Sequence, residues 1–391
     1  MALPQDKLKK LIDLMNSKSN VSCPVPMHPN IIELFDLAMD EQTMDFLLAV
    51  GADVCTVPQL EERYHQLYGG DAAAWNEFWQ EKIIAMSFMH PISNGERDLY
   101  EVTPIFPGWI EFYTAGPTDE KRSAILNKFV EFWQFNKLMN MPAMRAAADG
   151  KVLQAMAAGV PPRVTTYMSR GREITLNQPM TSQQQVLTKG DVYALLEKNH
   201  DDIAVGNCFC RQYKRINDKP SCEFGLPVEG CIVLGAIAEQ LVNNGVARKL
   251  TLEEACAMVD EFQRKGAVHT TYHYANDCNK EEIVICNCCP DCCLMYSFYR
   301  EAGLSKVYNR SFYSPRMVDE SRCVGCNLCG KYCPTEAVYY DKEAKKLVFD
   351  YDKCIGCGQC VNQCKFGVRE MVADERDVYV KTKAPATEAV K

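Results

Sequence analysis

The chain lacks the glycine-rich motifs that bind nucleotides, since its 391 residues contain neither a G-x-G-x-x-G fingerprint nor a Walker sequence. We therefore expect no nucleotide or flavin site that depends on them. It also lacks the run of about 18 apolar residues that a membrane span requires; even residues 232–242 are interrupted by Glu239 and Gln240. The first 20 residues carry spaced lysines rather than the unbroken apolar core of a signal peptide, so we expect a cytoplasmic protein with an ordinary N-terminal surface helix.

An excess of basic residues is also missing. The chain has 43 Lys and Arg against 51 Asp and Glu, a net charge of −8, whereas general nucleic-acid binders are basic. Histidine is scarce, with six residues. His269 and His273 are four apart and would share a face on a helix, but the third ligand of a catalytic zinc site is missing, so structural histidines are the expected reading.

Cysteine is abundant, with 21 residues. Small secreted domains rich in disulfides share this property, but this chain is long and has no export signal. Cys23 and Cys55 stand alone, while eleven cysteines lie between residues 208 and 293 and eight between residues 323 and 364. This pattern favours metal ligation by thiolates in the reducing interior of an anaerobe.

Two C-terminal runs have the spacing that holds iron–sulfur clusters: Cys323-x2-Cys326-x2-Cys329-x3-Cys333-Pro334 and Cys354-x2-Cys357-x2-Cys360-x3-Cys364. Two intervening residues let a tight loop point three sulfurs at one cluster. Zinc ribbons, the alternative, use two separated cysteine pairs instead. Glycines in the runs fit this geometry because they turn closely around a cluster at little cost.

Residues 315–372 resemble the bacterial-type 4Fe-4S ferredoxin module, including a hairpin expected over 337–349; Lys365 departs from the proline that often follows the fourth cysteine. In that module the fourth ligand of each cluster comes from the other run. The resemblance implies two 4Fe-4S clusters with crossed ligands: Cys323, Cys326, Cys329 and Cys364 for cluster 1, and Cys354, Cys357, Cys360 and Cys333 for cluster 2.

Nine further cysteines fall into two central groups: group A is Cys208, Cys210, Cys222 and Cys231, and group B is Cys286, Cys288, Cys289, Cys292 and Cys293. Five cysteines in eight residues cannot all face one apolar core, so metal ligation is the simpler explanation. In group A, buried structural cysteine is the alternative, but Arg211 and its neighbouring cations favour thiolates. Group B could form one cubane, share sulfurs with group A, or supply five thiolates to one cluster. Cys278 is a possible extra ligand, and Cys256 has the pattern of a core residue.

Together these segments resemble a family of iron–sulfur proteins of anaerobic bacteria. Members combine a winged-helix-like N-terminal part, a Cys-x-Cys-Arg segment, a Cys-Asn-Cys-Cys-x-x-Cys-Cys segment and a two-cluster ferredoxin. The resemblance implies about two further iron–sulfur clusters in the central region but says little about a substrate. The pairs Cys288-Cys289 and Cys292-Cys293 are also similar to those of heterodisulfide reductase catalytic subunits, although the long-range spacing differs.

The expected fold class is α+β, with a winged-helix-like domain, a mainly helical cysteine-rich domain and a ferredoxin-like domain. Helical periodicity is expected over residues 71–86, 121–139, 191–198 and 230–244, with a strand over 99–102 and extended pieces around Val164 and Ile174. The expected divisions are a helix over 1–20, a winged-helix-like domain over 21–117, a connection over 118–190, the cysteine-rich domain over 191–312, the ferredoxin domain over 313–375 and a flexible tail over 376–391.

The leading functional hypothesis is an electron-transfer protein that relays electrons between the ferredoxin module and central clusters or a partner oxidoreductase. One alternative is a reductase with a catalytic central cluster; another is a redox-sensing winged-helix regulator. Asp71, Glu77 and Glu81 on the candidate recognition helix oppose DNA binding. We expect a redox partner protein and no nucleic acid; the sequence indicates neither catalytic residues nor an oligomeric state.

Overall fold

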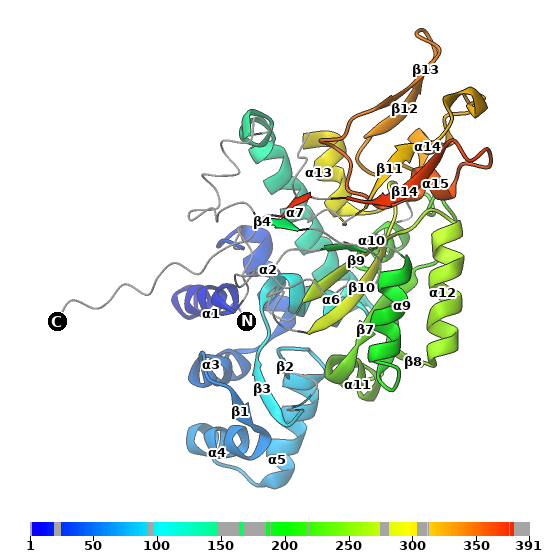
Figure 1. The fold of residues 1–391 in the computed structure, drawn as a ribbon. Helices are drawn as coiled ribbons and strands as arrows, with labels where there is room; N and C mark the ends of the chain where they lie inside the picture. Colours follow the sequence, from blue (N-terminus) through cyan, green and yellow to red (C-terminus); the bar gives the residue numbers. More distant parts are fainter. Residues whose placement is uncertain are drawn as a thin grey trace, which may run out of the picture.

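The computed structural model describes residues 2–18, 25–92, 95, 97–147, 164–166, 185–187, 189–217, 219–273, 281–302, 311, 313–374 and 376–378. Cys23, Cys278 and Ile174 lie outside these ranges. Helices and strands occur together throughout, so the predicted α+β class is confirmed (Figure 1). Within the described ranges, no helix combines the length and apolar character needed to cross a bilayer.

The N-terminal helix α1 (Gln5–Ser17) buries one face completely. Leu8, Leu11, Ile12 and Met15 are at most 1% exposed, as the spacing of three and four residues predicts for an amphipathic helix. This face packs into the same core as the helices that follow. The amphipathic reading of this segment is therefore confirmed.

A small sheet and five helical segments complete the N-terminal part. They are α2 (Pro29–Ala38), α3 (Glu41–Val50), β1 (Cys55–Thr56), α4 (Val57–Tyr68), α5 (Ala72–Glu77), the π-helix η1 (Phe78–Ile84), β2 (Met89–Pro91) and β3 (Leu99–Val102). The sheet order is β1-β3-β2, and Thr56 caps α4 in a capping box with Gln59. The single helix expected over 71–86 is instead an α-helix that continues as a π-helix, whose wider turn brings the adjacent Phe78 and Trp79 into the core together.

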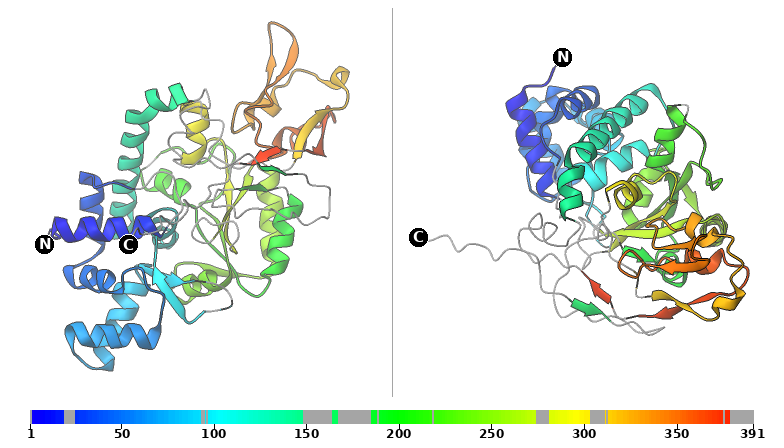
Figure 2. Two further views of the ribbon diagram at one scale, coloured as in Figure 1. Left: turned by 60° about the vertical axis from the view of Figure 1, so that its left-hand side comes forward. Right: turned by 90° about the horizontal axis from the view of Figure 1, so that it is seen from above.

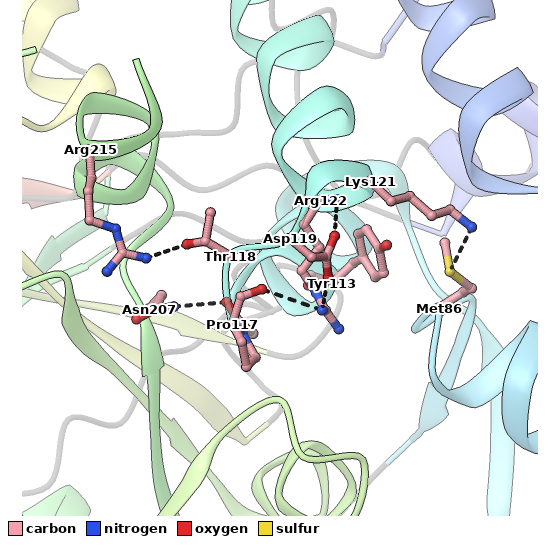
Figure 3. Close-up of polar contacts among 10 residues, drawn as sticks. Met86, Tyr113, Pro117, Thr118, Asp119, Lys121, Arg122, Asn207 and Arg215 are labelled. Carbon is pink, nitrogen blue, oxygen red and sulfur yellow. Dashed lines mark hydrogen bonds and ion pairs between the residues drawn. The ribbon is translucent and has the colours of Figure 1, made fainter. Parts of the chain in front are cut away.

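The connection to the centre runs through η2 (Ile105–Trp109), α6 (Ile110–Thr114) and the long helix α7 (Glu120–Ala147). Figure 3 shows how the turn before α7 is held. Asn207 Nδ2 donates to the Gly116 carbonyl at 2.8 Å, and Arg215 bonds the Thr118 hydroxyl. Arg122 Nε donates to the Tyr113 carbonyl at 3.1 Å. These contacts fix the N-terminal part against the segment that contains Cys208.

The central part is built on a six-stranded antiparallel sheet with the order β5-β9-β10-β7-β6-β8. The strands are β5 (Gln185–Leu187), β6 (Ile203–Asn207), β7 (Glu229–Leu234), β8 (Arg248–Leu250), β9 (Val268–His273) and β10 (Glu282–Cys288). The helices are α9 (Lys189–Lys198), α10 (Phe209–Ile216), α11 (Gly235–Asn243), α12 (Leu252–Arg264) and α13 (Leu294–Ala302).

Alternate residues of the sheet pack on opposite helices. Ile232 contacts the layer that contains α9 and α12, whereas its neighbour Val233 contacts α11 and α6. The description of this part as mainly helical therefore needs correction, because it omits the sheet. The helix expected over 230–244 begins as β7 and becomes α11 only at Gly235. Pairing with two neighbouring strands makes the first part of this segment a strand. The periodicity of the local sequence contains no information about such pairing.

The C-terminal part lies on the opposite side of the sheet from the N-terminal helices (Figure 1, Figure 2). Its elements are β11 (Tyr313–Met317), the 3-10 helix η4 (Glu320–Arg322), α14 (Leu328–Lys331), β12 (Val338–Asp341), β13 (Lys346–Phe349), α15 (Gln359–Asn362) and β14 (Arg369–Ala373). β11 pairs with β14, and β12 pairs with β13, so the predicted hairpin is confirmed. Residues 376–378, placed in the tail by the sequence, form β15 (Arg376–Val378) and pair with β4 (Val164–Thr166).

Candidate metal centres

The C-terminal cysteines line two adjacent cavities. The first is lined by the thiols expected for cluster 1, namely Cys323, Cys326, Cys329 and Cys364, and the second by those expected for cluster 2, namely Cys333, Cys354, Cys357 and Cys360. Cys360 borders both cavities. Each set therefore contains three thiols from one run and one from the other, which is the arrangement the ferredoxin resemblance implies.

Glycines allow these loops to turn tightly. Gly325 and Gly356 have φ of +71° and +73°, values that favour glycine. A Cβ at Gly356 would lie 2.2 Å from the Tyr313 carbonyl oxygen, and one at Gly325 would lie 2.8 Å from the Tyr340 ring. The loops thus approach their neighbours so closely that a side chain at either position would displace the thiols beside it.

The two cavities differ in exposure and share one buried cation. Cys326 beside the first cavity is exposed, whereas Cys354 and Cys360 beside the second are buried. Burial raises the pKa of the Cys360 thiol to about 12, and it also raises the pKa of Cys329. The positive charge of Arg369, whose side chain is 6% exposed, lowers the pKa of both thiols and so opposes the effect of burial. Its charge therefore stabilises thiolates at both cavities.

Six central thiols form a continuous row. Cys231 and Cys286 are paired across β7 and β10. Each thiol shifts the pKa of the next, which connects the set in the order Cys208, Cys210, Cys293, Cys288, Cys286 and Cys231. Among the described residues, no three of these sulfurs lie within 4.8 Å of one another. Burial and the neighbouring thiols raise the pKa values of several members, so a full set of thiolates requires a cation among them.

The other three central thiols form a separate trio: Cys222, Cys289 and Cys292. The Sγ atoms of Cys222 and Cys289 are 3.6 Å apart, and all three Sγ atoms lie within 4.8 Å of one another. Hydrogen bonds from Cys289 and Cys292 lower the pKa of Cys222, while contact with Cys222 raises the pKa of the other two. The trio thus favours one thiolate and resists further ones until a cation binds.

The spatial grouping differs from the sequence grouping. Group A and group B each contribute to both the row and the trio. Cys288 and Cys289 are adjacent in the chain but point to different sets, as do Cys292 and Cys293. The sequence reasoning correctly excluded a single apolar core for these cysteines, but it could not assign them to sets.

Arg211 connects the two sets electrostatically. Its side chain is 3% exposed, and Nη1 donates to the Asn287 carbonyl at 2.9 Å. Among the residues that the structure describes, Nε and Nη2 have no hydrogen-bond partner. The charge of Arg211 interacts with the thiols of Cys208 and Cys288 on one side and of Cys222 and Cys289 on the other. A buried guanidinium with unsatisfied donors requires nearby anions, so this surrounding fits metal-bound thiolates.

Several candidate residues do not join either set. Cys256 packs on α12 against the core, as expected. His269 and His273 lie on strand β9, where residues four apart are separated by about 13 Å, so they do not converge on one ion. His269 instead bonds Asn287 Oδ1 at 2.7 Å. Arg369 and Tyr296 were missed by the sequence reasoning, because neither belongs to a cysteine motif.

Comparison with known proteins agrees with the C-terminal cavities. Residues 322–368 match the family described as the 4Fe-4S dicluster domain, so this part of the chain is a bacterial-type two-cluster ferredoxin module. A 36-residue stretch is 50% identical to the "Ketoisovalerate oxidoreductase subunit VorD" of Pyrococcus horikoshii, which is 9% of this chain and 33% of that protein. No solved structure matches the chain.

Proposed function

We propose that this protein relays electrons between its ferredoxin module and a central iron–sulfur cluster, as the electron-transfer component of an oxidoreductase complex. The ferredoxin thiols would hold clusters 1 and 2 as the resemblance implies. Cys208, Cys210, Cys288 and Cys293 would hold the central cluster, with Cys286 and Cys231 adjoining it. When bound, these clusters supply one-electron carriers, while the chain sets their order, spacing and exposure.

The observation that carries the proposal is the apolar contact between the two modules. Cys357 and Ile355 from the second ferredoxin loop pack with Cys288, Cys293 and Tyr296 of the central part. Tyr296 is fully buried, and its phenol is affected by the charges of Cys288, Cys293 and Cys357 together. Ile355 and Cys293 are at most 5% exposed, so cluster 2 would face the central cluster across these buried side chains.

The module is held in this position by specific contacts. Gln359, fully buried, donates to the Ala267 carbonyl at 2.6 Å. Gln363 donates to the Arg264 carbonyl at 3.1 Å. Cluster 2 would face the central part, whereas Cys326 beside cluster 1 is exposed. Electrons would therefore enter or leave the protein at cluster 1 and pass between cluster 1 and the central cluster through cluster 2.

A role for the N-terminal part in docking completes the proposal. From α3 on, its order of helix, strand, helix, helix, strand and strand, with α5 and η1 counted as one helix and the sheet order β1-β3-β2, supports a winged-helix-like domain. The acidic residues Asp71, Glu77 and Glu81 along α5 and η1 disfavour DNA. The likeness of a 36-residue stretch to an oxidoreductase subunit supports an oxidoreductase as the partner.

The test is anaerobic iron analysis with EPR spectroscopy of the reduced protein. We expect about twelve irons per chain, eight in the ferredoxin module and four in the central cluster. Cys208→Ser should remove about four irons and leave the ferredoxin signals intact. Cys256→Ser is the matched control, since it alters a thiol outside both sets. About eight irons in the unmodified chain, with no change in Cys208→Ser, would rule out the central cluster.

A further inference from the structure

We propose that Cys222, Cys289 and Cys292 bind a single Zn²⁺ ion rather than an iron–sulfur cluster. The inference goes beyond the electron relay, because it depends on three thiols that the relay does not use. The site is built from two segments that are far apart in the sequence, the loop after α10 and the loop after β10.

The separation of the sulfurs distinguishes the two kinds of centre. Tetrahedral zinc with Zn–S bonds of about 2.3 Å places its sulfurs about 3.8 Å apart. A cubane binds each thiolate at a different iron corner, which places the sulfurs roughly 6 Å apart. The Sγ atoms of Cys222 and Cys289 are 3.6 Å apart, and the whole trio lies within 4.8 Å. This spacing fits one ion and is too small for a cluster.

The local sequence has the form of a zinc-binding loop. Cys289-Pro290-Asp291-Cys292 is a Cys-x2-Cys segment, which is a ligand spacing of zinc sites. The Cys292 amide donates to Cys289 Sγ at 3.3 Å. Backbone amides of Phe224 and Leu226 donate to the Cys222 sulfur. These donors orient the sulfurs and stabilise them as thiolates, as outer-shell hydrogen bonds do at metal sites.

The surrounding charges suit such an ion. Three thiolates and Zn²⁺ carry a net charge of −1. Lys214 lies close to Cys222 and Cys292, and pairs with Asp291 at 2.9 Å. Arg211 approaches from the other side. Within the described part of the chain, no fourth Cys, His, Asp or Glu atom joins the trio. Zinc sites with three protein ligands take water or substrate in the fourth position.

The position of the site indicates what the ion would do. The loop that contributes Cys222 also touches the ferredoxin module, where Phe224 packs on Tyr332 with ring centres 4.8 Å apart and Glu223 pairs with Lys331 at 2.7 Å. A redox-inert ion there would tie this loop to the Cys289–Cys292 segment, beside Cys288 and Cys293. It would keep the ferredoxin module and the central thiols in fixed positions relative to each other without carrying electrons.

The test measures zinc and iron together in the full chain, purified anaerobically, by elemental analysis. We expect one zinc per chain. Cys222→Ser should reduce zinc at least tenfold and leave iron unchanged, while Cys256→Ser should change neither. Replacement of the zinc by Co²⁺ should give the intense visible bands of a tetrahedral thiolate site, and these should be absent in Cys222→Ser.

The outcomes separate the two proposals. Loss of about four irons in Cys222→Ser, with zinc absent from the unmodified chain, would show that the trio holds a cluster and would overturn the zinc site. Absence of both metals from the trio would overturn it as well. Neither result tests the proposed central cluster, which is tested by Cys208→Ser. If Cys222→Ser does not fold, the Co²⁺ spectrum of the unmodified chain still tests the zinc site. Visible bands of tetrahedral thiolate coordination support the site, and their absence overturns it.

Discussion

Arg211 should stabilise the metal-loaded protein far more than the metal-free protein. In the metal-loaded protein its guanidinium compensates thiolates on both sides and donates to the Asn287 carbonyl at 2.9 Å. Arg211→Met removes this charge from a site that is 3% exposed. Breaking a buried charge pair costs about 3–5 kcal/mol, so we expect a loss of that size in the free energy of unfolding.

In the metal-free protein the same substitution should cost much less. Burial and the neighbouring thiols raise the pKa of Cys288 and Cys289, so these two thiols are protonated without a metal. The guanidinium then keeps only Cys208 and Cys222, whose pKa values are lowered, as anionic partners, and its desolvation is offset only in part. The loss of the hydrogen bond to Asn287 costs about 1–3 kcal/mol in both forms. The difference between the two forms is the prediction.

Anaerobic denaturant unfolding of the metal-loaded and chelator-treated chains measures both effects. Arg248→Met is the control, because Arg248 is half exposed and pairs with Glu229 at the surface; it should cost at most about 1 kcal/mol in both forms. Redox titration gives a second readout. Loss of the Arg211 charge beside these thiols should shift the potential of the central cluster to more negative values, because the positive charge favours the more negative, reduced cluster. An equal loss with and without metal would refute this reasoning, since Arg211 would then act through its close packing on Gly230.

Three further predictions concern other parts of the chain. Gly356→Ala should lower the iron content of the ferredoxin module, because its Cβ would lie 2.2 Å from a carbonyl oxygen, whereas Gly245→Ala, at a similar positive φ with open space, should cost only about 1–2 kcal/mol; equal iron content in both would contradict the steric argument. Desolvation raises the pKa of Glu111 from 4.5 to about 8, so the folded state retains a proton that the unfolded state releases, and stability should fall as pH rises from about 4.5 to 8. Glu111→Gln should flatten this decline in urea midpoints, and an unchanged slope would exclude Glu111 as its source. Tyr296→Ala should slow electron passage to the central cluster and destabilise the fold by about 3–5 kcal/mol, as for other buried aromatics, whereas Tyr296→Phe should preserve the rate in freeze-quench EPR; equal rates in both would remove Tyr296 from the route.

The sequence alone determined the features whose cause is local. The spacing of Cys323 to Cys364 predicted both ferredoxin loops, because two intervening residues and a glycine are enough to turn three thiols toward one point. The helix over the first 20 residues was equally readable, since the periodicity of α1 depends on neighbours three or four residues away.

Only the tertiary structure decided how the central thiols are grouped. Cys222 joins Cys289 and Cys292 because the loop after α10 returns to the end of β10, a contact across more than 60 residues that no local spacing encodes. The pairing of β7 with β10 places Cys231 opposite Cys286. Chain order reports neither relation, because both depend on strand register and on the packing of segments that are distant in sequence.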